Sequence, residues 1–143
     1  MTDDGIGPAV VRCLRDDGLG PGVLAVDACT ALVDALDLVP SGADVLVVDA
    51  VSGGGAPGTV YRIPLGDLAA QRAVTLHDPS LPEAFAMARL SGASFGTVTV
   101  LGVEPARVAP GAELSPVLAQ RLPAIVETVR GEIERLSGLT RAR

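Results

Sequence analysis

An unbroken run of apolar, mostly β-branched residues at positions 45–48 is the strongest feature of the hydrophobic pattern. Turn residues bound this run, which is typical of a strand buried on both faces of a sheet. The run ends at Asp49, and an acid at the end of a buried strand is costly to desolvate unless it is paired, hydrogen-bonded or bound to a metal. Because open α/β sheets bind ligands at that edge, we interpret Asp49 as the centre of a site.

Other apolar segments alternate along the chain with segments of helical spacing. Further strands are predicted at residues 23–26, 59–63 and 97–103. Helices are predicted at residues 8–17, 31–39, 80–91 and 115–136. Thr30 and Ser80 are predicted N-caps, and Gly18 and Gly92 are predicted to end their helices. Pro123 is predicted to break or kink the last helix, and the tail from residue 139 to fray. This alternation predicts a single α/β domain, 1–143, with a mostly parallel twisted sheet flanked by helices on both faces.

Composition narrows the class of protein. The chain of 143 residues is 48% hydrophobic, which is enough for one domain with a real core. A net charge of −6 and only 2% aromatic residues disfavour nucleic acid as a partner. No stretch is apolar enough to span a membrane and no secretory signal is visible. The two cysteines, Cys13 and Cys29, form no CxxC pair, and this usage favours the cytoplasm.

Three polar residues stand at predicted junctions between strands and loops: Asp4, Asp49 and His77, the one histidine of the chain. Two carboxylates and an imidazole could form a divalent-cation site with open positions. The residue types exclude a three-histidine or a four-cysteine zinc centre. Each residue also has a simpler interpretation. A lone histidine is often a surface or hydrogen-bonded residue, and an acid such as Asp4 ahead of a helix is often there for the helix dipole.

Two alternatives remain open from the residues alone. Cys29 and His77 could form a thiol–imidazole pair, although Cys29 also suits a small buried residue in a tight turn. The glycine-rich segment 53–58 predicts a flexible loop that permits close approach, and a small-ligand α/β domain could use it. That loop lacks the following helix of a dinucleotide motif and the Gly-Lys-Ser/Thr of a P-loop.

Six short motifs, in a fixed order, cover nearly the whole chain. They are Asp-Asp-Gly-Ile-Gly at 3–7, Asp-Ala-Cys-Thr at 27–30, Val-Val-Asp-Ala-Val at 47–51, Gly-Ala-Pro-Gly-Thr-Val at 55–60, Leu-His-Asp at 76–78, and Leu-Gly-Val-Glu-Pro at 101–105 followed by Leu-Ser-Pro at 114–116. In this set and order the chain resembles the hydrogenase maturation endopeptidases, which trim the C-terminal extension from the large subunit of nickel–iron hydrogenases. The family begins with a strand ahead of the first motif, so we expect that first strand to be missing from this chain.

The resemblance implies roles for individual residues. It places the metal-binding and catalytic positions at Asp4, Asp49 and His77, with Asp49 or Asp4 as our hypothesis for the general base. It associates Asp27, Ala28, Cys29 and Thr30 with recognition of the precursor. The implied metal is nickel carried by the precursor, although the free protein could bind another divalent ion. The implied partner is the large-subunit precursor. The alternative is a non-catalytic module that senses nickel or chaperones the precursor. These motifs do not give the oligomeric state.

Overall fold

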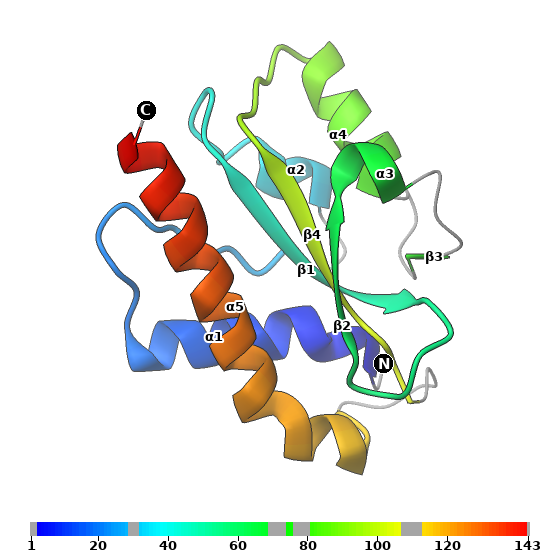
Figure 1. The fold of residues 1–143 in the computed structure, drawn as a ribbon. Coiled ribbons are helices and arrows are strands. Elements are labelled where there is room, and N and C mark those ends of the chain that lie inside the picture. Colours follow the sequence, from blue (N-terminus) through cyan, green and yellow to red (C-terminus); the bar gives the residue numbers. More distant parts are fainter. Residues whose placement is uncertain (1–2, 29–31, 69–73, 76–80, 107–112, 143) are drawn as a thin grey trace.

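Helices cover both faces of a four-stranded sheet in the described part of the computed structural model (Figure 1). The structure describes residues 3–28, 32–68, 74–75, 81–106 and 113–142; within these ranges it leaves out the side chains of residues 4, 74–75 and 139–142. Its helices and strands are η1 (Asp3–Gly5), α1 (Ile6–Asp17), α2 (Leu32–Leu36), β1 (Val45–Ser52), β2 (Val60–Pro64), α3 (Leu65–Leu68), β3 (Val74–Thr75), α4 (Leu81–Leu90), β4 (Val98–Val103) and α5 (Pro116–Ala142).

The sheet has the strand order β2-β4-β1-β3. β1 runs parallel to β4, whereas β2 is antiparallel to β4 and β3 is antiparallel to β1. The sheet of the described residues is therefore mixed, in contrast to the mostly parallel sheet that the pattern predicts. The reason lies in connection length. Residues 53–59 join β1 to β2, and a parallel return needs a crossover of a dozen or more residues.

One face of the sheet packs against α2, α3 and α4. Its core is a single cluster of buried side chains that includes Val51 and Val100 from the strands and Phe85 from α4. Phe85 is completely buried and meets the ring of Phe95 edge to face, with the ring centroids 5.0 Å apart. The capping residue predicted for α4, Ser80, lies outside the described residues, but Gly92 ends the helix as predicted, with a φ of 102°.

The opposite face packs against α1 and α5, the first and last long helices (Figure 1). Ile6 and Val10 of α1 and Leu118 of α5 are fully buried there, against Leu101 and Val103 of β4. The expectation of helices on both faces is thus confirmed. No helix in the described ranges has the length and apolar character needed to cross a membrane.

The structure corrects several local predictions. Residues 23–26 form no strand; the Arg15 guanidinium instead donates to the carbonyl of Ala25 at 3.2 and 2.6 Å, and the Leu24 side chain is 67% exposed. α2 ends at Leu36, and its predicted N-cap Thr30 lies outside the described residues. α5 continues through Pro123 to Ala142, so this proline does not break it and the helix includes most of the tail predicted to fray.

Candidate functional site

Asp49 lies inside β1 rather than at its end, because Ala50 and Val51 continue the buried strand to Ser52. It is the register partner of Gly102 in β4 and is only 4% exposed. One of its carboxylate oxygens, Oδ1, accepts a hydrogen bond of 2.8 Å from the backbone N–H of Ala50. The alternation of the strand places Asp49 on the same face as Val51. The predicted strand and the burial of its acid are confirmed, but Asp49 lies inside the strand and residues 45–48 are only partly buried.

The backbone that carries Asp4 lies beside this strand. Asp4 belongs to η1, which packs against β1 and leads directly into α1. The first turn of α1 approaches so closely that a Cβ added to Gly7 would lie 2.6 Å from the carbonyl oxygen of Val48, the residue before Asp49. A glycine is therefore required at position 7. The fold thus brings the elements bearing two of the three predicted ligands next to each other.

The complete three-residue site remains a prediction. His77 lies outside the described residues, as does the side chain of Asp4. Among the side chains that are described, no three from His, Cys, Asp and Glu are grouped so that they could hold a metal ion. The recognition segment is described only in part. Asp27 and Ala28 are partly buried at the end of a stretch without regular structure, whereas Cys29 and Thr30 fall outside the described ranges. The alternative of a Cys29–His77 thiol–imidazole pair therefore also involves residues outside those ranges.

Asp3, which sequence reasoning did not select, is a fully buried acid with well-placed donors. Its Oδ1 accepts a hydrogen bond from the backbone N–H of Ser115 at 2.7 Å. Its Oδ2 accepts hydrogen bonds from the Ser115 hydroxyl at 2.8 Å and from the backbone N–H of Ala106 at 2.8 Å. Ser115 directly precedes α5, at the start of the helix predicted from residue 115, and its hydroxyl donates to this carboxylate distant in sequence. Asp3 therefore ties η1 to the start of α5.

Glu104 is a second buried acid that sequence reasoning missed. It directly follows β4 and is 5% exposed. Its Oε1 accepts hydrogen bonds from the backbone N–H groups of Gly53 at 3.0 Å and Gly55 at 2.7 Å, and from the Tyr61 hydroxyl at 2.9 Å. The glycine loop, predicted to be flexible, is thus held by a carboxylate. Because a carboxylate of the chain itself occupies these two amides, the geometry gives no support to a small anionic ligand there.

The same sequence signal that selects Asp49 applies to Glu104. Both acids follow a run of apolar residues, residues 45–48 in one case and 98–103 in the other. Attention to the second run would have found Glu104. Burial and the Glu104 carboxylate raise the pKa of the Tyr61 hydroxyl above its usual value of 10.0, so Tyr61 remains a hydrogen-bond donor at neutral pH.

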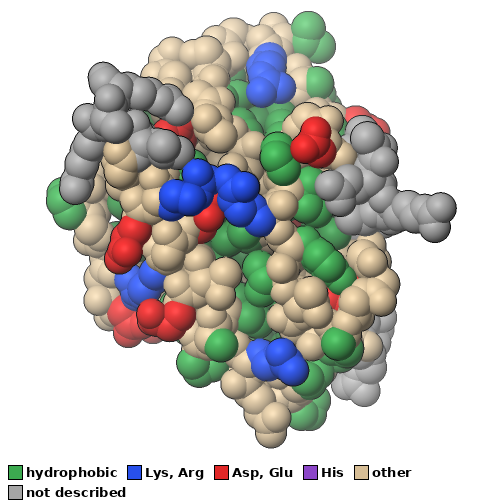
Figure 2. Space-filling view, in the orientation of Figure 1, with side chains coloured by type: hydrophobic (Ala, Val, Ile, Leu, Met, Phe, Trp, Pro, Cys, Tyr) green, Lys and Arg blue, Asp and Glu red, His purple; other side chains and the backbone are tan. Residues whose placement is uncertain are grey.

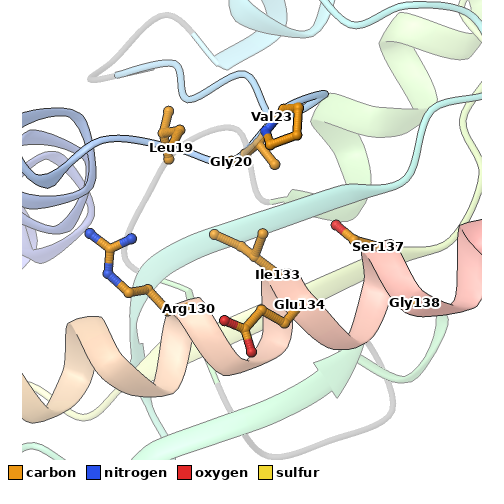
Figure 3. Close-up of a pocket in the computed structure, with 9 residues that line it drawn as sticks. Leu19, Gly20, Val23, Arg130, Ile133, Glu134, Ser137 and Gly138 are labelled. Atoms are coloured by element: carbon orange, nitrogen blue, oxygen red, sulfur yellow. The ribbon is translucent and has the colours of Figure 1, made fainter.

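A cavity of about 250 Å³ lies away from these acids, between the segment after α1 and the second half of α5 (Figure 3). Its lining includes Leu19 and Val23 on one side and Arg130, Ile133 and Glu134 on the other. The Arg130 guanidinium is engaged there, at 3.3 Å from an Asp17 carboxylate oxygen and 3.3 Å from the Gly18 carbonyl. None of the described residues that line this cavity belongs to the predicted site.

Charged side chains are scattered over the face of the molecule seen in Figure 2, and basic groups adjoin acidic ones at its centre and lower left. An ion-pair cluster is centred on Glu132 of α5. Its carboxylate oxygen Oε1 accepts hydrogen bonds from Arg62 of β2 at 2.9 Å and from Arg135 at 2.5 Å. These hydrogen bonds lower the pKa of Glu132 below its usual value of 4.5, and the one from Arg135 has the largest effect. The cluster joins an edge strand to α5.

Known proteins resemble this chain in sequence pattern and in fold. A family model described as hydrogenase maturation protease (HycI) matches residues 8–132. Similar solved structures include the hydrogenase maturating endopeptidase HybD of E. coli, with 23% identity, a TM-score of 0.78, and coverage of 94% of this chain and 86% of that one. An endopeptidase from E. coli shows 25% identity, a TM-score of 0.75 and coverage of 90% and 82%.

A third similar structure is the hydrogenase 2 maturation peptidase of Thaumarchaeota archaeon SCGC_AB-539-E09. It shows 28% identity, a TM-score of 0.65 and coverage of 93% of this chain and 90% of that one. No curated protein sequence matches the chain. The likeness thus extends over most of each compared structure.

Proposed function

Because the chain belongs to the hydrogenase maturation protease family, we propose that it is an endopeptidase that removes the C-terminal extension of a nickel–iron hydrogenase large-subunit precursor after nickel insertion. The observation that carries the proposal is the family match over residues 8–132, which includes Asp49, a buried acid in the strand that packs against the element bearing Asp4. We assign the reaction to the cytoplasm, which the free thiol of Cys13 supports.

In this proposal the nickel is part of the substrate. Asp4, Asp49 and His77 contact the nickel already bound in the precursor and so place the scissile peptide. Carboxylate and imidazole groups are suitable donors for a divalent first-row metal. Asp49 fits this role because a carboxylate that is 4% exposed has lost most of its water, which strengthens its interaction with a cation. An uncleaved precursor without nickel would lack that interaction.

Peptide hydrolysis needs a polarised carbonyl and an activated water. A metal ion held next to the scissile bond supplies both, because it acts as a Lewis acid and lowers the pKa of a bound water. Asp49 or Asp4 would then accept the proton as general base. Asp27, Ala28, Cys29 and Thr30 are assigned to contacts with the precursor, and a partner as large as a hydrogenase subunit needs contacts beyond the three metal-directed residues.

The scaffold supports preorganisation of this site. Asp3 ties η1 to α5, and Gly7 lets α1 lie against Val48, so the backbone at position 4 is held from both sides. Catalytic groups need such support because small displacements of a reacting group cost large factors in rate.

The test is the intact mass of a nickel-loaded large-subunit precursor before and after incubation with this chain. We expect loss of a C-terminal peptide from the nickel-loaded precursor and no change in the nickel-free one. Cleavage of both forms would contradict nickel recognition, while the assignment of the chain as an endopeptidase would still hold. A precursor that binds the chain on a native gel but is never shortened would instead indicate the non-catalytic binding module.

A further inference from the structure

The loop that follows β1 is fastened to the sheet through a single carboxylate oxygen. Glu104 Oε1 accepts two backbone N–H groups of the loop, from Gly53 and Gly55, and the hydroxyl of Tyr61. The Tyr61 hydroxyl in turn accepts a hydrogen bond of 2.9 Å from the Gly55 N–H. Hydrogen bonds to a charged, buried acceptor are among the stronger ones in proteins. The loop conformation is therefore specified by two side chains that lie outside the loop.

The two glycines are required by the same contact. A Cβ added to Gly55 would lie 2.4 Å from the Tyr61 hydroxyl oxygen, and one added to Gly53 would lie 2.8 Å from the Tyr61 ring carbon Cζ. Backbone hydrogen bonds also hold the end of the loop to residue 104. Gly58 donates to the Glu104 carbonyl at 2.8 Å, and Glu104 donates to the Thr59 carbonyl at 2.8 Å.

The fastened loop is nevertheless exposed. Residues 53–57 are solvent-exposed, whereas Glu104 beneath them is buried. The loop follows Ser52 directly, at the end of the strand that contains Asp49 (Figure 1). With three consecutive glycines it presents peptide groups rather than side chains, which permits close approach by another backbone. An exposed segment with a fixed conformation pays little ordering entropy when it binds a partner.

We propose that Glu104 and Tyr61 are positioning residues, which hold residues 53–58 as a preformed rim that binds the backbone of the precursor peptide. This inference rests on the proposed function. It assigns the clamp to binding and not to the chemical step, because neither side chain lies in the set Asp4, Asp49 and His77. Release of the rim should weaken precursor binding and leave the turnover of bound precursor largely intact.

Tyr61→Phe is the sharpest variant because it keeps the ring and removes one hydroxyl. We expect the Kd and the KM for the nickel-loaded precursor to rise roughly three- to tenfold, with kcat changed by less than about twofold. Glu104→Gln keeps an oxygen acceptor and should have the smaller effect, whereas Glu104→Leu removes the acceptor and should have the larger one. Arg62→Gln is the matched control, because it loses a contact from the same strand to Glu132 rather than to the loop.

A double-mutant cycle adds a readout inside the clamp. Gly55→Ala should be strongly destabilising in the native sequence, where the new methyl meets the Tyr61 hydroxyl. In the Tyr61→Phe background the nearest ring atom would be Cζ at 3.4 Å, so the same substitution should be milder. Equal effects in the two backgrounds would contradict the geometry of the clamp.

Two results would overturn the inference. The first is an unchanged Kd and KM in Tyr61→Phe and Glu104→Leu, accompanied only by the loss of thermal stability that Arg62→Gln also shows; this would assign the clamp to stability alone. The second is a wild-type chain that neither binds nor cleaves the precursor, which would also remove the proposed function. A wild-type chain that binds without cleaving would contradict the protease, while the Kd values of the variants would still decide the role of the rim.

Discussion

The carboxylate of Asp3 accepts hydrogen bonds from both the backbone N–H and the hydroxyl of Ser115, 112 positions further along the chain, at 2.7 and 2.8 Å. This relationship fastens the short helix η1 to the start of α5. Asp4 is the next residue after Asp3. Its backbone position therefore depends on the hydrogen bonds between Asp3 and Ser115. Stability and site geometry are coupled at this point.

Replacement of Asp3 by alanine should destabilise the protein by about 2–4 kcal/mol, because the N–H groups of Ser115 and Ala106 and the Ser115 hydroxyl would lose their acceptor. The free energy of unfolding from urea denaturation measures the effect. Ser115→Ala removes only the hydroxyl and should cost about 1 kcal/mol. An Asp3→Ala variant as stable as the native protein would show that the buried carboxylate contributes nothing net to folding.

Gly7→Ala should disturb the contact between α1 and β1. The added methyl would lie 2.6 Å from the Val48 carbonyl oxygen, and a backbone atom cannot move aside as a side chain can. We expect a loss of roughly 1–3 kcal/mol in stability and a loss of precursor cleavage, since the shift occurs next to Asp49. Gly5→Ala is the matched control, because a Cβ there meets no atom within 4 Å. Equal stability of the two variants would contradict the close approach.

The ion-pair cluster around Glu132 predicts a pH dependence of stability. Its pKa is lowered in the folded state, so its contribution is present above its usual value of 4.5 and is lost as the pH falls through the folded value. Glu132→Gln should therefore be less stable than the native protein at pH 7, and the difference should shrink below about pH 4.5. Thermal unfolding of both proteins from pH 7 to pH 3 measures this. If the difference in stability between the two proteins stays constant over this pH range, the contribution of Glu132 does not depend on the charge of its carboxylate.

His77→Ala and Asp49→Asn should each abolish cleavage of the nickel-loaded precursor while the fold is retained. If these residues contact the nickel or the reacting water, kcat/KM should fall by at least about 100-fold. Circular dichroism checks the fold and intact mass checks the cleavage. Asp67→Asn, which changes an exposed acid of α3, is the control and should cleave normally. Normal processing by His77→Ala would remove that residue from the site.

Local pattern was sufficient for most of the elements. The run at 45–48, the strand before Glu104 and the helix ended by Gly92 all lie where apolar spacing and turn residues place them. Pattern was insufficient where a partner decides the outcome. Residues 23–26 have the composition of a strand, but a strand exists only when another pairs with it, and here Arg15 binds the backbone at Ala25. Likewise, strand direction depends on connection length, which apolar composition does not report.

The site shows the same division. Desolvation identifies Asp49 from sequence, because a buried acid needs a hydrogen-bond partner, an ion pair or a bound cation. The partners of Asp3 could not be predicted, because Ser115 and Ala106 are more than 100 positions away and their approach requires the finished fold. Glu104 could have been found by the reasoning applied to Asp49, but its acceptance of the loop amides depends on the position of Tyr61 across the β2–β4 pair.

The packing of α1 against α5 has a consequence for synthesis on the ribosome. The layer on that face of the sheet combines Ile6 and Val10 with Leu118 and Ile125, so its two halves lie more than 100 residues apart along the chain. Until residues 115–126 have emerged from the exit tunnel, the apolar side of α1 has no cover and Asp3 lacks the N–H groups that it binds. The layer behind the predicted site is therefore completed only after residues 115–126 have left the tunnel, long after residues 3–10.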